Sequence, residues 1–146
     1  MNKRVSMMII TLCLFGAMAV ASAQAQTVEK FVVHIPFSFT VGGKTLPAGD
    51  YRIETIAFGG AQLYSKLLIK STDGRSSRIV ATLPARSRAM QERSKLIFHR
   101  YGEQYFLSRV WTAGTDTGRE LRKTSAEEKL ARGGTERQVV PILARP

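Results

Sequence analysis

Cations and aromatic rings alternate along residues 95–111, KLIFHRYGEQYFLSRVW, and these are the residue types that bind anions. On an open sheet face, rings can stack on bases or sugars while lysine and arginine hold phosphate or carboxylate groups. With the basic residues that precede it, the stretch supplies the candidate binding residues Arg86, Arg88, Arg93, Lys95, Arg100, Tyr101, Tyr105, Arg109 and Trp111. The alternative, which we favour, is a hairpin whose rings fill the core and whose charges face water.

The triplet Asp116-Thr117-Gly118 matches the catalytic triplet of aspartic proteases, in which two carboxylates share a proton and activate water. A single copy would need a second chain to supply the other carboxylate. Gly114 and Thr115 precede the triplet here, whereas apolar strand residues precede it in the proteases. We therefore predict a turn in which Asp116 binds its own backbone, and no enzymatic activity.

Two further features could hold a phosphate or a metal. Gly43-Lys44-Thr45 matches the end of a phosphate-binding loop, but the first glycine of that loop would fall on Ser38, and strands flank the motif. His34 and His99 are the only histidines, and a zinc site would have to be completed by carboxylates alone. We predict neither a metal site nor another cofactor.

The elements that must position these residues are strands. Every odd position from Phe31 to Val41 is apolar, which is the period of a strand with one buried face. Pro36 cannot donate to a sheet ladder, so it should divide this stretch into two strands or mark an edge or bulge. Gly42-Gly43 suits the positive backbone angles of a tight hairpin turn, and Pro47-Ala48-Gly49 predicts a second turn.

Similar signals continue to residue 122. Gly59-Gly60 opens a strand in which Leu63, Leu67 and Ile69 share a face, and residues 71–74 turn the chain into a return strand where Ile79, Ala81 and Leu83 alternate. Residues 84–94 have no steady period and predict a mobile basic loop. A second hairpin follows around the turn 102–104, and residues 119–122 can add a short strand.

The last part of the chain predicts one helix. Ser125 and Glu128 fit a capping box, which predicts a helix over residues 126–132 that Gly133 stops. About seven short strands with a single short C-terminal helix predict a mainly β domain, either an antiparallel β-sandwich or a small β-barrel. The sequence does not choose between the two.

The N-terminus has the plan of a secretory signal peptide. Lys3 and Arg4 precede an apolar run over residues 7–20, and Ala21-Ser22-Ala23 fits a cleavage site. We expect residues 1–23 to be removed, residues 24–134 to form one mainly β domain, and residues 135–146 to be an edge strand or a disordered tail. The expected location is periplasmic or extracellular, with no transmembrane segment after cleavage.

Charge points to anionic partners. Of the 22 lysines and arginines, removal of Lys3 and Arg4 leaves 20 against 11 acidic residues, a net charge of +9. An exported basic protein meets anionic polymers and lipid surfaces, so this balance does not indicate a specific nucleic acid. The single cysteine, Cys13, lies in the predicted leader, so the mature domain must be stabilised by its core rather than by disulfides.

The segments VHIPFSFTVGGKTLPAGDYRIE, LIFHRYGEQYFLSRVWTAGTDTGREL and SAEEKLAR resemble small exported proteins of unknown function that are common in acidobacterial genomes. The resemblance covers most of the mature chain. It implies a signal peptide and a mostly β domain, and it implies no catalytic or ligand-binding residues.

Three functions follow as hypotheses. The first is a non-enzymatic exported domain that binds an anionic envelope or extracellular component through the basic residues 86–100. The second is a small barrel that carries an apolar ligand in its interior, and the third is a hydrolase that uses Asp116. A filled interior would favour the first over the second, and a roomy apolar interior would favour the second.

Overall fold

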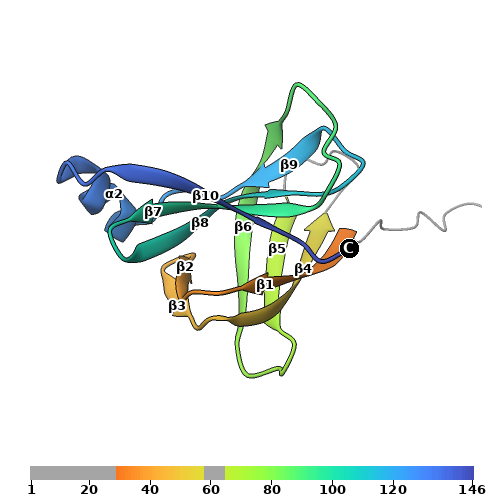
Figure 1. Ribbon diagram of the computed structural model, residues 1–146, viewed down its shortest axis with the longest axis horizontal. Helices are drawn as coiled ribbons and strands as arrows, with labels where there is room; N and C mark the ends of the chain where they lie inside the picture. The colour runs from red at the N-terminus through yellow and green to blue at the C-terminus, as the bar shows by residue number, and fades with distance from the viewer. Residues whose placement is uncertain (1–28, 58–64) are drawn as a thin grey trace, which may run out of the picture.

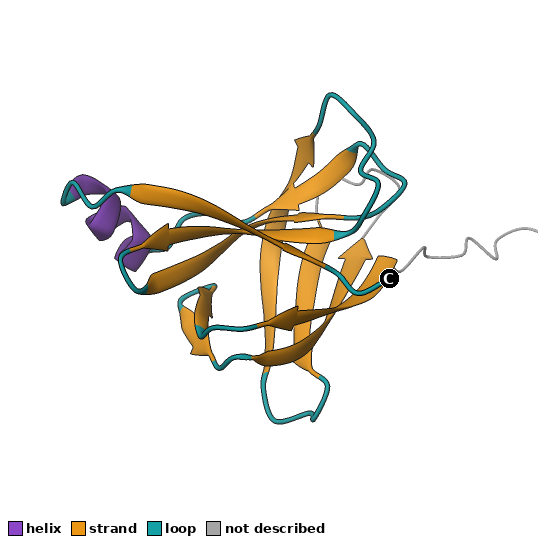
Figure 2. Ribbon diagram, in the orientation of Figure 1, coloured by secondary structure: helices purple, strands orange, loops and turns teal. Residues whose placement is uncertain are grey.

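The computed structural model describes residues 29–57 and 65–146, and these residues form a mainly β fold with one short helix (Figures 1 and 2). The predicted signal peptide lies outside the described residues, as do the predicted turn Gly59-Gly60 and Leu63. The predicted fold class is confirmed, because the strands make an open, sandwich-like sheet with a single helix near the C-terminus.

Within the described residues the sheet has ten strands rather than about seven. In chain order the elements are β1 (Glu29–Ile35), β2 (Phe39–Val41), β3 (Lys44–Leu46), β4 (Gly49–Ala57), β5 (Ser65–Ser71), β6 (Ser77–Arg86), β7 (Lys95–Tyr101), β8 (Gln104–Trp111), β9 (Thr117–Glu120), α2 (Ser125–Arg132) and β10 (Arg137–Leu143). The sheet is also mixed rather than purely antiparallel, because β2 pairs with β8 in parallel at Thr40 and Phe106.

The strands divide into two layers that share β6. In the first layer, β1, β4, β5 and the first part of β6 pair in that order. In the second, β10, β7 and β8 pair in order, and β8 is followed by β9 and by the β2–β3 hairpin. The last residues of β6, from Leu83 to Arg86, pair with β9, so this long strand passes from one layer to the other (Figure 1).

The core lies between these layers and is built from alternate strand residues, as the period-two pattern predicts. Val33 and Ile35 of β1 are fully buried, and so are Leu67 and Ile69 of β5. Completing this core are Phe39, Val41, Leu46, Tyr51, Ile53, Leu96, Phe98, Leu107, Val110 and Leu121. Side chains fill the space between the layers, and the ring of Phe39 meets those of both Tyr51 and Phe98 edge to face.

The first predicted hairpin has the expected form. β1 ends at Ile35, one residue before Pro36, and β2 begins at Phe39. Gly42 and Gly43, with φ of 54° and 79°, turn the chain from β2 into β3. This backbone region favours glycine, which has no Cβ to clash with the preceding carbonyl.

The alternating pattern predicted that Ile79, Ala81 and Leu83 form the apolar, buried face of β6, but in the structure this face is exposed. Ile79 and Leu83 retain 55% and 42% of their accessible surface, and Ala81 is exposed as well. Val80 packs against the core instead, and Thr82 is buried with its hydroxyl 2.8 Å from that of Ser65. The cross-strand hydroxyl pair takes the inward position because each group satisfies the other.

The prediction of a mobile loop over residues 84–94 is wrong for its first three residues, which belong to a strand. The remaining residues form a loop that is hydrogen-bonded to the rest of the fold. Pro84, Ala85 and Arg86 belong to β6. The Ser87 amide donates to the Asp116 carbonyl, and the Gln91 amide donates to the Thr115 carbonyl. These bonds attach the loop to the turn between β8 and β9.

The helix starts one residue before the predicted start. Its N-cap is Thr124, whose hydroxyl accepts from the Glu127 amide at 3.2 Å, so Ser125 is the first helical residue rather than the cap. Glu127 is the one buried residue of the helix, and its carboxylate lies 2.8 Å from His99 Nδ1. Glu128, which the capping box assigned to the cap, is exposed.

The C-terminal tail forms the edge strand β10, which pairs with β7 alone. Pro141 lies within β10, as an edge position permits. Beyond β10, the Arg145 amide donates to the Val32 carbonyl at 3.2 Å and so brings the tail against β1. No helix in residues 29–57 and 65–146 is long and apolar enough to cross a membrane.

Candidate functional site

The predicted aromatic face on the second hairpin does not form. Tyr101 and Trp111 are buried, with 3% and 8% of their surface exposed, so neither ring can stack on a ligand. Tyr101 lies beside Phe106 in a region covered by α2, where Glu127 is its neighbour. Trp111 packs against Gly118 so closely that a Cβ there would lie 2.5 Å from the ring.

The third ring, Tyr105, is half-buried on the other side of the hairpin. It stacks on Phe37, with ring centroids 3.8 Å apart, and the Arg100 guanidinium lies 5.5 Å from its centroid. Tyr105 pairs with Arg100, the neighbour of Tyr101, so the two tyrosines face opposite sides. A bulge turns Trp111 away from Tyr105, since Ile97 pairs with Arg109 and Phe98 pairs with Leu107. The extra residue, Ser108, reverses which side chains of β8 face inward.

The predicted cations are spread over several elements. Arg86 and Arg88 are exposed, at the end of β6 and in the loop after it, and Lys95 is half-buried at the start of β7. The other three are engaged within the fold: Arg93 donates to the Ala144 carbonyl, Arg100 to the Gly102 carbonyl, and Arg109 pairs with Glu120. The nine predicted binding residues therefore do not converge on one surface.

The other sequence motifs lie in ordinary structural positions. Asp116 is exposed in the turn before β9, and its carboxylate accepts from the Thr117 hydroxyl at 3.1 Å. His34 is paired with Asp50 at 2.8 Å on the surface of the first layer. Across the described part of the chain, no three His, Cys, Asp or Glu side chains lie close enough together to hold a metal ion.

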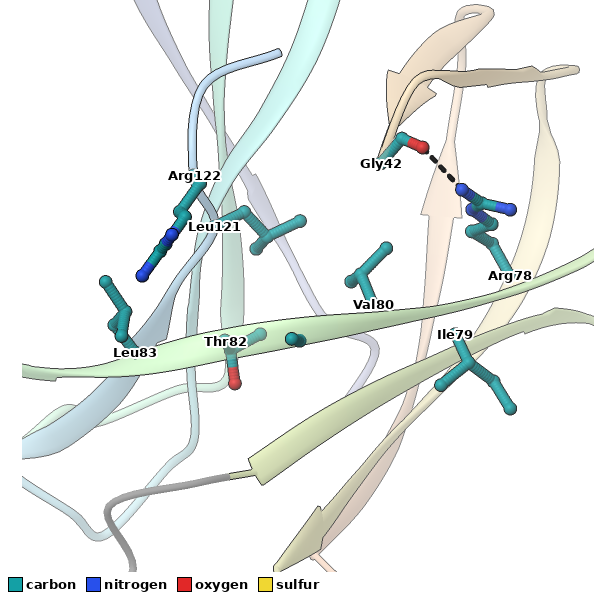
Figure 3. Close-up of a pocket in the computed structure, with 9 residues that line it drawn as sticks. Gly42, Arg78, Ile79, Val80, Thr82, Leu83, Leu121 and Arg122 are labelled. Carbon is teal, nitrogen blue, oxygen red and sulfur yellow. Dashed lines mark hydrogen bonds between the residues drawn. The ribbon is translucent and has the colours of Figure 1, made fainter.

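A groove beside β6 has the features of a binding site (Figure 3). Its volume is about 570 Å³, within the range of about 300–1,000 Å³ that small-ligand sites have. Three segments distant in the sequence line it: the turn after β2 at Gly42, the strand β6, and the two residues after β9. The lining residues are Gly42, Arg78, Ile79, Val80, Ala81, Thr82, Leu83, Leu121 and Arg122.

The groove runs along the edge of β6 rather than over a face of the sheet. Successive side chains of a strand point to opposite faces, so a hollow over one face is lined by alternate residues. Here all six residues from Arg78 to Leu83 contribute. Val80 and Ile79 lie on opposite sides of the strand, and lining residues from both sides are typical of a hollow at a strand edge (Figure 3).

Apolar side chains and two arginines share this groove. Val80 and Leu121 project into it from opposite walls and connect it to the core, and Ile79 and Leu83 add exposed apolar surface (Figure 3). Arg122 lies on the wall that follows β9, and Arg78 lies at the end near Gly42. A ligand that combines apolar groups with negative charge would match this lining.

Arg78 has an unused hydrogen-bond donor. Its Nη2 donates to the Gly42 carbonyl at 2.6 Å, which fixes the guanidinium at the groove. Its Nε is buried and, among the described residues, is the only buried side-chain polar atom without a partner. A buried donor without an acceptor is destabilising by about 1–3 kcal/mol. Because the Nε is covered, a ligand in the groove would interact with the charge of the guanidinium rather than with this atom.

Gly42 shapes the same end of the groove. A Cβ at this position would collide with a methyl group of Val80 and would lie 3.3 Å from Arg78 Nε. The glycine therefore lets the hairpin turn approach β6 closely enough for its carbonyl to hold Arg78.

Sequence reasoning missed this site because its walls meet only through tertiary structure. Gly42 and Arg78 are 36 residues apart, and no local pattern relates them. The one usable signal was the run Ile79, Val80, Ala81 and Leu83, in which both faces of a strand are apolar. Such a strand has more apolar surface than one core can cover.

Comparison of the chain with protein-family models, with curated proteins and with solved structures finds no match.

Proposed function

We propose that this protein is a non-enzymatic exported domain that binds an anionic partner, and that the groove beside β6 is its binding site. The observation that carries the proposal is the groove itself, where two arginines, Arg78 and Arg122, border the apolar side chains of Val80 and Leu121. We propose this groove in place of the basic residues 86–100 as the binding site, because the cations of that segment lie on several elements and do not form one surface. The resemblance to exported acidobacterial proteins is compatible with this proposal and assigns no activity.

Net charge supports an anionic partner. The described residues contain all the charged residues except Lys3 and Arg4, so they have the charge of +9 expected for the processed chain. A positive field of this size attracts anions over about a Debye length and raises their association rate. Arginine then pairs with carboxylate or phosphate through directed N–H donors.

Carriage of an apolar ligand in the interior has less support. The side chains between the layers contact one another, and the groove opens at the sheet edge rather than inside a closed barrel. An apolar ligand would also supply no negative charge to the two arginines that line the groove. The groove therefore favours a ligand with both apolar and acidic groups.

Binding of fluorescein-labelled poly-glutamate and of inorganic polyphosphate to the processed protein tests the proposal, with fluorescence anisotropy and competition as readouts. We expect Arg78→Gln and Arg122→Gln each to weaken binding about tenfold, since a charge-assisted hydrogen bond is worth about 1.5–3 kcal/mol. Binding should also weaken steeply as salt rises. Circular dichroism should show that each variant remains folded.

Arg88→Gln is the matched control, because Arg88 is exposed and lies outside the groove. It should bind nearly as tightly as the unchanged protein. If Arg88→Gln weakens binding and the two groove variants do not, the site is wrong. If neither polyanion binds at low salt, the proposed function is wrong.

A further inference from the structure

β6 has a strand partner on one side only over its first six residues. Residues from Ser77 to Thr82 pair with β5. On the opposite side, pairing with β9 begins at Leu83, and no other strand in residues 29–57 and 65–146 is paired with that edge. In a strand paired on one side, alternate N–H and C=O groups point away from the partner strand.

The groove occupies this unpaired edge. It is lined by the residues from Arg78 to Leu83, so five of the six edge residues face it. The far wall, which contains Gly42 and Leu121, closes the space from the other side (Figure 3). Backbone donors and acceptors of a strand edge therefore lie within a slot that has apolar walls.

We propose that the partner in this groove is an extended acidic peptide segment that pairs with β6 as an added strand, a proposal that rests on the anion-binding function above. Strand addition at an exposed sheet edge obtains affinity from main-chain hydrogen bonds and specificity from pockets for alternate side chains. The acidic side chains of the segment would bind Arg78 and Arg122, and the apolar side chains between them would face the opposite side of the sheet, where Ile79 and Leu83 are exposed.

The two arginines determine the chemistry of the segment. Arg78 and Arg122 lie toward opposite ends of the groove, so a strand added along β6 would have a cation near each end. Each guanidinium charge would attract a carboxylate of the segment. Apolar residues at the intervening positions would cover Ile79 or Leu83, which are half-exposed without a partner.

A second copy of the chain is a weaker occupant than an acidic peptide. Among the described residues, the edge strands of a second copy are β1, β3 and β10, which contain Lys30, Lys44 and Arg137, respectively. The C-terminal tail already binds β1 through the Arg145 amide and the Val32 carbonyl, and Pro141 lacks a donor in β10. Each of these strands would bring a further cation to the two arginines, and the two copies would each have a charge of +9. Like charges at such distances oppose pairing.

The test uses the processed protein and a synthetic peptide, acetylated and amidated, in which glutamate and valine alternate over six residues. The matched control has the same sequence with methylated nitrogens on alternate residues, which removes the main-chain donors from one edge and retains the charge. Hydrogen exchange measured by NMR reports the amides of β6 in the free and bound protein.

Alternation is the expected signature. Between Ser77 and Thr82, every second amide should exchange readily in the free protein and become protected at least tenfold by the peptide. The amides between them, already bonded to β5, should change little. The N-methylated peptide should bind at least tenfold more weakly, and Arg78→Gln and Arg122→Gln should each reduce binding of the unmodified peptide.

The outcomes separate the two proposals. If the peptide binds without protecting alternate amides of β6, or if the N-methylated peptide binds as tightly, strand addition is wrong and anion binding stands. If poly-glutamate and polyphosphate bind in the groove but the peptide does not, the same conclusion follows. If none of the three binds, both proposals are wrong. Protection of these amides that grows with protein concentration alone would assign the edge to a second copy and overturn the peptide.

Discussion

The contact between His99 and Glu127 should determine whether α2 stays attached to the sheet. Glu127 is the one buried residue of a helix of eight residues, and its Oε1 lies 2.8 Å from His99 Nδ1. Only 4% of the Glu127 side chain and 14% of the His99 side chain are exposed. An isolated helix of this length is not stable in water, so its attachment depends on this contact.

The magnitude follows from what Glu127→Ala would leave behind. The substitution leaves the buried His99 Nδ1 without its partner, which is destabilising by about 1–3 kcal/mol. Detachment of the helix would give His99 access to water and limit the cost, so we expect a loss of about 2 kcal/mol in the free energy of unfolding.

Urea unfolding of the processed protein, followed by circular dichroism and by Trp111 fluorescence, measures this loss. Glu128→Ala is the matched control, because Glu128 is the neighbouring residue of α2, is half-exposed, and has only an i,i+4 contact with Arg132 at 3.6 Å. The control should change the free energy of unfolding by less than about 0.5 kcal/mol. Glu127→Gln, which retains a hydrogen-bond acceptor, should lie between the two alanine variants.

Two results would refute the reasoning. If Glu127→Ala costs less than about 1 kcal/mol, the contact does not hold the helix. If Glu128→Ala costs as much as Glu127→Ala, the loss comes from helix propensity or from net charge rather than from the buried pair. Protection of the His99 amide against hydrogen exchange distinguishes a detached helix from a globally weakened fold.

Two further predictions concern the hairpin turn and the buried tyrosines. Gly42→Ala should destabilise the fold more than Gly43→Ala, because a Cβ at Gly42 collides with Val80 whereas one at Gly43 meets nothing within 4 Å. Thermal unfolding of both variants checks this prediction. Equal losses of stability in the two variants would contradict it. Burial raises the pKa of Tyr51 and Tyr101 above 10.0, so the free energy of unfolding should fall above about pH 10, where the unfolded chain loses protons that the folded chain retains. Urea unfolding at several alkaline pH values tests this, and the fall should be smaller when both tyrosines are replaced by phenylalanine.

Local signals were sufficient for most of the strands. The period of two over residues 31–41, the break at Pro36 and the glycines at 42 and 43 each have a direct backbone cause, so the structure reproduces them. The short strands β9 and β10 escaped a firm prediction because four to seven residues with mixed side chains have weak periodicity. β9 pairs with β6 and β10 pairs with β7, and these pairings with distant strands determine that they are strands.

The orientation of β6 and of the second hairpin could not be predicted. In β6 both alternate sets contain apolar residues, so the pattern shows a strand without showing which face the core covers. In β8 the extra residue Ser108 shifts the register, and a bulge of this kind has no reliable sequence signature. The candidate aromatic site failed because Tyr101 and Tyr105 face opposite sides of the hairpin and because Tyr101 and Trp111 are buried.

The unpaired edge of β6 is itself an argument for binding. Proteins protect such edges with charges, bulges or covering loops, since an exposed edge promotes aggregation. Arg78 lies at this edge and its Nη2 bonds the Gly42 carbonyl, which resembles such protection. This protection is incomplete, because Ile79 and Leu83 remain exposed and, among the described residues, no strand pairs with this edge between Ser77 and Thr82. An added strand would pair the free main-chain groups and cover both side chains, so the edge is better explained as a binding site than as a protected margin.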